Sequence, residues 1–90
     1  MVRDVMESLL KDELRVLAIR TRSRLNLTQK EMAMRFEMSE SSYSDIETGV
    51  FMCGTLTTML LLSEQEDPKT YLETLKVKLE EHIEKEMNLL

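Results

Sequence analysis

Residues 28–49 read TQKEMAMRFEMSESSYSDIETG, and this stretch decides the fold. Thr28 and Glu31 have the spacing of a capping box, in which the hydroxyl accepts from the third amide and the carboxylate accepts from the amide of Thr28. Ser39 is a good N-cap for a second helix, and Gly49 is suited to end that helix in the left-handed conformation. The stretch therefore predicts two short helices joined by a tight turn.

Apolar side chains at helical spacing give the two helices a common inner face. Its members are Met32, Ala33 and Phe36 in the first helix, Met38 in the turn, and Tyr43 and Ile46 in the second helix. Ala33 is small enough for the two helices to cross closely. We expect these residues to form the centre of the core.

Helical patterns continue on both sides of this unit. Residues 2–24 contain no Gly or Pro and predict one long helix, or two with a kink near residues 11–13. A further helix is expected from Thr55 to about Leu62. Asp67 and Pro68 then mark the start of a last helix to about Met87, because Asp caps well and Pro fits the first helical position.

We therefore expect an all-α fold of five helices. Its parts are an N-terminal helical extension (residues 1–13), a central domain (residues 14–65) and a C-terminal amphipathic helix (residues 66–90). The last helix carries an apolar stripe of Leu72, Leu75, Leu79, Ile83 and Met87. The stripe predicts a homodimer interface, with packing onto its own domain as the alternative.

The composition of the chain excludes several classes of protein. The 90 residues include one cysteine, Cys53, which excludes an internal disulfide framework and a cysteine-based zinc site and favours a reducing cytoplasm. The longest apolar run is far too short to span a membrane. The single histidine, His82, has no evident metal-ligand partners, and no nucleophile or phosphate-loop motif occurs, so we expect no enzyme, cofactor or metal site.

The net charge of −5 is unevenly distributed. Residues 1–45 hold eight Lys/Arg and eight Asp/Glu, whereas residues 46–90 hold four and nine. The acidity therefore lies in the second half, where it need not face a nucleic acid.

LTQKEMA at residues 27–33, followed by M-S-x-S-x-Y-S-x-I-E-x-G at residues 38–49, resembles the helix-turn-helix of phage-repressor-like regulators of the Cro or XRE type. The resemblance covers about residues 14–62. It implies a lambda-repressor-like DNA-binding domain with an extended N-terminal helix and a long amphipathic C-terminal helix. It also implies a partly buried ion pair between Arg22 of the first helix and Glu47 of the recognition helix at residues 39–47.

The same resemblance assigns DNA-contacting roles. Base edges would be read by Glu40, Ser41, Ser44 and Asp45. Phosphates would be bound by Gln29, Ser42 and Thr48, with supporting charge from Lys30 and Arg35. If Arg22 is used internally, the positive residues that remain for phosphates also include Arg20 and Arg24. The implied function is a sequence-specific repressor that binds double-stranded DNA as a dimer.

Three features depart from the family pattern. Glu37 occupies the turn position that is usually Gly, the recognition helix has acidic residues but no Lys or Arg, and the following loop, residues 50–53, is apolar rather than basic. An exposed apolar cluster usually marks an interface, so this loop either contacts a partner or folds into the core. The alternative function is a protein-interaction module on the same fold, antitoxin-like or anti-repressor, with little DNA binding.

Overall fold

The computed structural model describes residues 2–51 and 53–88, and over these ranges it contains helices and no strands. In chain order the helices are α1 (Val2–Leu25), α2 (Gln29–Arg35), α3 (Glu40–Thr48), α4 (Thr55–Ser63) and α5 (Pro68–Asn88). The all-α prediction is confirmed for the described residues. α1 is a single helix, without the alternative break near residues 11–13. The ends of the predicted first and last segments, residues 1 and 89–90, lie outside the described residues.

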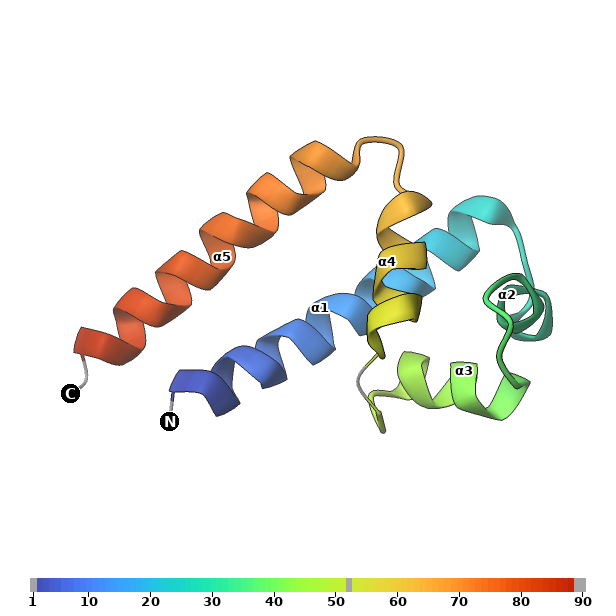
Figure 1. Ribbon diagram of the computed structural model, residues 1–90, viewed down its shortest axis with the longest axis horizontal. Helices are drawn as coiled ribbons and strands as arrows, with labels where there is room; N and C mark the ends of the chain where they lie inside the picture. The colour runs from blue at the N-terminus through green and yellow to red at the C-terminus, as the bar shows by residue number, and fades with distance from the viewer. Residues whose placement is uncertain (1, 52, 89–90) are drawn as a thin grey trace.

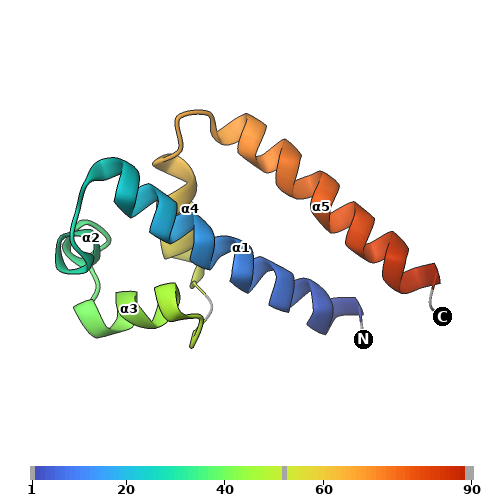
Figure 2. The same cartoon turned by 180° about the vertical axis from the view of Figure 1, so that it is seen from behind.

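The two long helices, α1 and α5, run antiparallel, so both chain ends lie at the same end of the molecule (Figure 1). The three short helices gather around the C-terminal half of α1, and the view from behind shows the same arrangement (Figure 2). α1 contacts α3, α4 and α5, and α2 contacts α3. The molecule therefore consists of a globular end and a two-helix extension, with a longest dimension of 45 Å.

The core unites α1 to α4 around Tyr43. The Tyr43 ring is fully buried, and its hydroxyl donates to the carbonyl of Ala18 at 3.3 Å. Phe36 packs beside it in a tilted arrangement, with ring centroids 6.4 Å apart. The other core residues are Leu14, Leu17, Ala18, Met32, Ala33, Ile46, Cys53 and Leu61. Met38, in the turn, is half-buried against this core.

The predicted N-caps of α2 and α3 are present. Thr28 Oγ1 accepts from the Glu31 amide at 3.1 Å, and Glu31 Oε1 accepts from the Thr28 amide at 3.0 Å. Hydrogen bonds from Thr28 to the Glu31 carboxylate, led by that from the Thr28 amide, lower the pKa of Glu31. Ser39 caps α3 by accepting from the Ser42 amide at 3.1 Å. The sequence thus specifies the starts of both short helices through local contacts.

The ends of the first three helices share one backbone motif. At the end of α2, Glu37 adopts a left-handed φ of 54°, and the next amide, of Met38, donates to the Ala33 carbonyl at 3.0 Å. This is the Schellman arrangement, which satisfies helix-terminal carbonyls. Asn26 (φ 57°) and Gly49 (φ 79°) occupy the same place at the ends of α1 and α3. The Glu37 turn therefore forms without glycine.

We expect Glu37→Gly to raise the free energy of unfolding by about 0.5–1 kcal/mol, because glycine avoids the steric cost of the left-handed region but loses more backbone entropy. Urea denaturation would measure the change. Glu73→Gly, at an exposed position inside α5, is the matched control and should lower stability by about 1 kcal/mol. A loss of stability for Glu37→Gly would contradict the turn geometry.

Candidate nucleic-acid interface

α3 is presented with one face buried and the other in solvent. Tyr43, Ile46 and Glu47 are buried, whereas Glu40 and Ser41 are exposed at its first turn. The remaining predicted DNA contacts of α3 are Ser42 and Thr48, which are exposed, and Ser44 and Asp45, which are half-buried. The structure therefore brings the four predicted base-facing residues onto one short helix at the surface.

Arg22 and Glu47 join α1 to α3 through a two-pronged ion pair. Arg22 Nε lies 2.7 Å from Glu47 Oε2, and Arg22 Nη2 lies 3.0 Å from Glu47 Oε1. The remaining terminal nitrogen of Arg22 donates to the Leu27 carbonyl at 3.2 Å. The Glu47 side chain is 5% exposed and the Arg22 side chain 26% exposed. Glu47 therefore depends on Arg22 for most of the stabilisation of its charge.

The protonation equilibrium of Glu47 reflects this setting. Burial acts to raise the pKa of Glu47, and hydrogen bonds led by that of Arg22 act to lower it, with a net lowering. The hydrogen bond that Arg22 donates to Glu47 raises the pKa of the Arg22 guanidinium. Both groups are thus held in their charged forms.

Gln29 is drawn into the same cluster. Its Nε2 donates to Glu47 Oε1 at 3.1 Å, so the first residue of α2 is tied to the last turn of α3. The side chain predicted to bind a phosphate thus also makes an internal contact. A second amide hydrogen on the same nitrogen and the amide oxygen remain for other partners.

Two of the predicted phosphate-binding cations, Arg35 and Arg24, contact residues at and just after the C-terminal end of α4. Arg35 Nη2 lies 2.7 Å from Glu64 Oε1, and Arg35 Nε donates to the same oxygen at 2.8 Å. Arg24 donates to the Glu64 carbonyl and lies 3.9 Å from Glu66 Oε1. Sequence reasoning did not identify Glu64, because its partners are 29 and 40 residues away and no local pattern links them.

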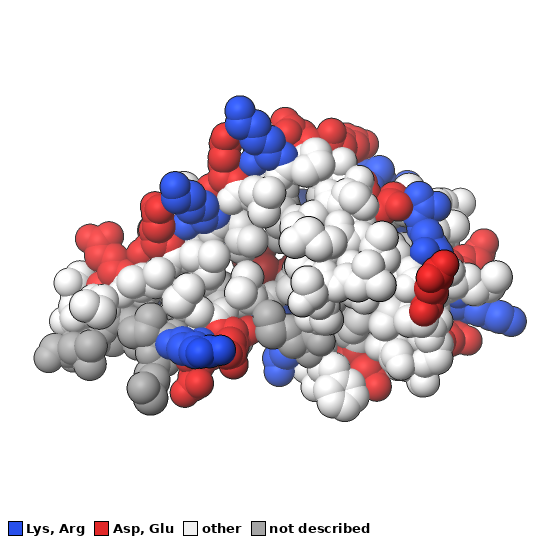
Figure 3. All heavy atoms as spheres, in the orientation of Figure 1, with Lys and Arg blue, Asp and Glu red and all other residues white. Residues whose placement is uncertain are grey.

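The other two predicted cations are differently placed. Lys30, on α2, and Arg20, on α1, are exposed and have no ion-pair partner among the side chains that the structure describes. On the face shown in Figure 3, basic side chains lie singly and beside acidic ones, and no continuous basic area is visible. Lys30 is therefore the predicted phosphate contact on α2 whose charge is most available.

Exposed apolar side chains lie beside this interface. Val50 and Phe51, directly after α3, are 60% and 62% exposed, while Cys53 is buried and Met52 lies outside the described residues. Met34, on α2, is 70% exposed. The predicted apolar loop is thus divided: its first two residues face solvent and Cys53 joins the core.

The apolar stripe of α5 is also divided. Leu75, Leu79 and Ile83 are half-buried, whereas Leu72 and Met87 are exposed. α5 contacts α1, and Lys78 of α5 pairs with Glu13 of α1 at 3.0 Å. Part of the stripe is therefore covered within the chain, and its two ends are open to a partner.

The histidine and cysteine have ordinary surroundings. His82 is half-buried on α5, and burial raises the pKa of the Cys53 thiol, so that this group stays protonated. Within the described residues, no group of three or more His, Cys, Asp or Glu side chains is placed to hold a metal ion. None of the described helices combines the length and apolar character needed to cross a membrane.

Comparisons with protein-family models, curated proteins and solved structures give no match to this chain.

We expect Arg22→Met to lower the free energy of unfolding by about 2–4 kcal/mol at pH 7, somewhat less than the 3–5 kcal/mol typical of a fully buried pair, because Arg22 is partly exposed. Because the pKa of Glu47 is lowered on folding, its charge stabilises the folded state above the ordinary value of 4.5, and this contribution is lost as pH falls through the folded value. The cost of the substitution should therefore shrink below about pH 4. Thermal and urea denaturation from pH 3 to 7 would measure both effects.

Arg3→Met is the control, because Arg3 forms an exposed ion pair with Glu7 on α1. It should change stability by less than about 0.5 kcal/mol at either pH. Equal stabilities for Arg22→Met and Arg3→Met would contradict a structural role for the buried pair.

Proposed function

We propose that the chain is a sequence-specific DNA-binding transcriptional regulator, a dimeric repressor with a lambda-repressor-like helix-turn-helix. The observation that carries the proposal is the α2–α3 unit. Its inner face is buried, the Arg22–Glu47 pair fixes α3 against α1, and the first turn of α3 is left exposed. A short, rigidly held helix with a polar outer face is what entry into a major groove requires.

The polar residues of α3 suit particular contacts. The carboxylates of Glu40 and Asp45 can accept from the exocyclic amine of cytosine, and the hydroxyls of Ser41 and Ser44 can donate or accept. Lys30 supplies a free positive charge near the start of α2. Phosphate contacts would position the helix and base contacts would give specificity.

The charge distribution favours binding by two copies. Neutralisation of phosphates supplies a large part of the affinity for DNA, and here Arg24 and Arg35 face Glu64 and Glu66. One protomer alone would therefore bind weakly. The exposed ends of the α5 stripe, Leu72 and Met87, offer the contact through which a second copy would bring its own α3 to the next half-site.

The direct test is selection of duplexes from a random pool, followed by fluorescence anisotropy at about 50 mM salt, where phosphate contacts are strongest. We expect enrichment of a palindromic site. Lys30→Gln should weaken binding to all duplexes and reduce the magnitude of the salt slope by about 1.8 for the dimer, about 0.9 for each of its two Lys30 phosphate contacts. Absence of any binding above random duplex by the wild type would refute the proposal.

Glu64→Gln gives a second test, because it leaves the shape of the side chain and removes the charge that holds Arg35. We expect DNA affinity to rise about three- to ten-fold. A surface ion pair such as Arg35–Glu64 contributes up to about 1 kcal/mol, and without it Arg35 can bind a phosphate instead. The matched control is Glu73→Gln, the same charge change on the exposed face of α5, which should alter affinity less than about two-fold because of salt screening. Equal effects of the two variants would contradict the role given to Glu64.

A protein-interaction module is the second candidate, and a specific observation favours it. Val50 and Phe51 are exposed immediately beside an acidic α3, which suits a partner with an apolar patch and basic rim. Under this alternative, neither the wild type nor Glu64→Gln binds DNA, and Phe51→Ser abolishes partner capture without unfolding the chain. Binding of a selected duplex by the wild type would decide against it.

A further inference from the structure

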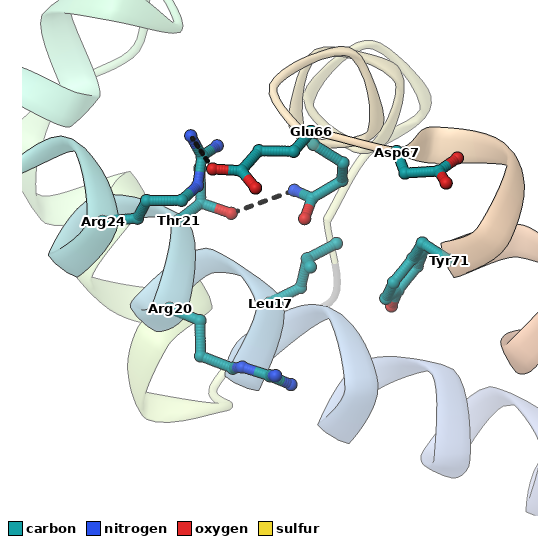
Figure 4. A pocket seen from close by; sticks show the side chains of 8 residues that line it. Leu17, Arg20, Thr21, Arg24, Glu66, Asp67 and Tyr71 are labelled. Carbon is teal, nitrogen blue, oxygen red and sulfur yellow. Dashed lines mark hydrogen bonds and ion pairs between the residues drawn. The ribbon is translucent and has the colours of Figure 1, made fainter.

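A pocket of about 400 Å³ lies where α5 leaves the globular end of the molecule. One wall is α1, and the others are the α4–α5 connection and the first turn of α5 (Figure 4). Pockets that bind small organic ligands usually span roughly 300–1,000 Å³ and combine apolar walls with a few polar groups. The volume of this pocket lies near the lower end of that range.

The hydroxyl of Tyr71 is the most unusual group in the pocket. Its oxygen is buried and has no hydrogen-bond partner among the described residues. Burial raises the pKa of Tyr71, with a further contribution from Glu13, so the hydroxyl stays protonated and available as a donor. Buried polar groups are nearly always paired, and one that is not calls for a partner from outside the chain.

Arg20 supplies the second free group. Figure 4 shows Tyr71 projecting from α5 toward α1 and Arg20 extending from α1, and both side chains line the pocket. The positive charge of Arg20 acts to lower the pKa of Tyr71, against the larger effect of burial. No ion pair to Arg20 occurs in the part of the chain that the structure describes.

The acidic groups of the pocket are already engaged. Glu66 lies 3.9 Å from Arg24, and both carboxylate oxygens of Asp67 accept from Thr70, at 3.1 Å from its amide and 2.7 Å from its hydroxyl. The nearby Glu13 pairs with Lys78. Asp67 keeps its negative charge, because Thr70 is a neutral partner. Among the described residues, the Arg20 guanidinium and the Tyr71 hydroxyl are the donors of the pocket without a partner, and a carboxylate, with one negative charge and two acceptor oxygens, would satisfy both.

The apolar part of the pocket defines the rest of the ligand. Leu17 and the ring of Tyr71 line it, while Gln65 Nε2 donates to Thr21 Oγ1 at 3.0 Å and to the Leu61 carbonyl at 2.8 Å. We propose that this pocket binds a small organic carboxylate, which accepts from the Tyr71 hydroxyl and the Arg20 guanidinium and lays its apolar body on Leu17. The site is separate from α3 and does not depend on DNA binding.

A bound carboxylate would contact α1, the α4–α5 connection and α5 together. The connection also holds Glu66, which pairs with Arg24, a predicted phosphate contact. The ligand would thus contact three elements at the joint between the two-helix extension and the globular end.

The test is an amide-resolved NMR titration of the full chain with benzoate, with benzamide as the uncharged control of the same shape. We expect benzoate to shift the amides of residues 17–24 and 65–71 in a saturable way and benzamide to bind at least about three-fold more weakly, since it lacks the charge that Arg20 would pair. Tyr71→Phe and Arg20→Gln should each weaken benzoate binding about three- to ten-fold, the value of one lost hydrogen bond. Arg3→Gln, the same charge change at the far end of α1, should leave it unchanged.

Three results would overturn the proposal. They are an absence of saturable shifts, equal affinity for benzamide, or equal affinity in Tyr71→Phe and the wild type. Thermal unfolding without ligand tests the premise: Tyr71→Phe should melt no lower than the wild type, because the hydroxyl has no partner to lose. A clearly lower melting temperature would mean that the free protein already satisfies the hydroxyl.

Discussion

The nearly buried carboxylate of Glu47 is the constraint on which the globular end depends. A charge withdrawn from water has to be matched, and here Arg22 matches it with two hydrogen bonds while Gln29 adds a third. These three residues belong to α3, α1 and α2. The orientations of three helices are therefore fixed at one side chain, and the apolar core fills the space that this junction defines.

The same logic governs the surface. Arginines that would serve an anionic partner are held by the end of α4 and the connection that follows it, through Glu64 and Glu66. The side chain of Arg35 is about half exposed, so water weakens its pair and a competing anion can reach it. The acidic residues of the second half of the chain are thus not all distant from α2 and α3. Part of it lies against the positive residues of the first half, which lowers the net field around α2 and α3.

The features that the sequence predicts correctly depend on contacts between residues that are close together in the chain. The Thr28 capping box, the Ser39 cap, the left-handed Gly49 and the start of α5 at Pro68 all depend on residues within a few positions of one another. The inner faces of α2 and α3 follow from helical spacing in the same way. The all-α architecture could therefore be predicted from the chain alone.

Reasoning from local pattern could not reach contacts that depend on the packing of distant helices. Glu64 meets Arg35 only because α4 crosses α1 beside α2, and the pocket at Tyr71 exists only because α5 turns back along α1. Asn26 was also missed as a left-handed residue, although asparagine tolerates that conformation better than most. Three of the five residues of the α5 stripe are half-buried within the chain for the same reason, since the pattern identifies an apolar face but not the helix that packs on it.

The left-handed residues that end α1, α2 and α3 leave almost no free chain between these helices. Each reverses the backbone within one residue, and Leu27 and Met38, the residues that follow the first two, already pack against the core. An added residue in either connection would rotate the next helix by about 100° around its axis and turn its buried face to water. Differences in chain length among proteins built on this plan should therefore be confined to the segments before α4 and before α5. The lengths of the α1–α2 and α2–α3 connections therefore determine the packing of the first three helices as much as their side chains do.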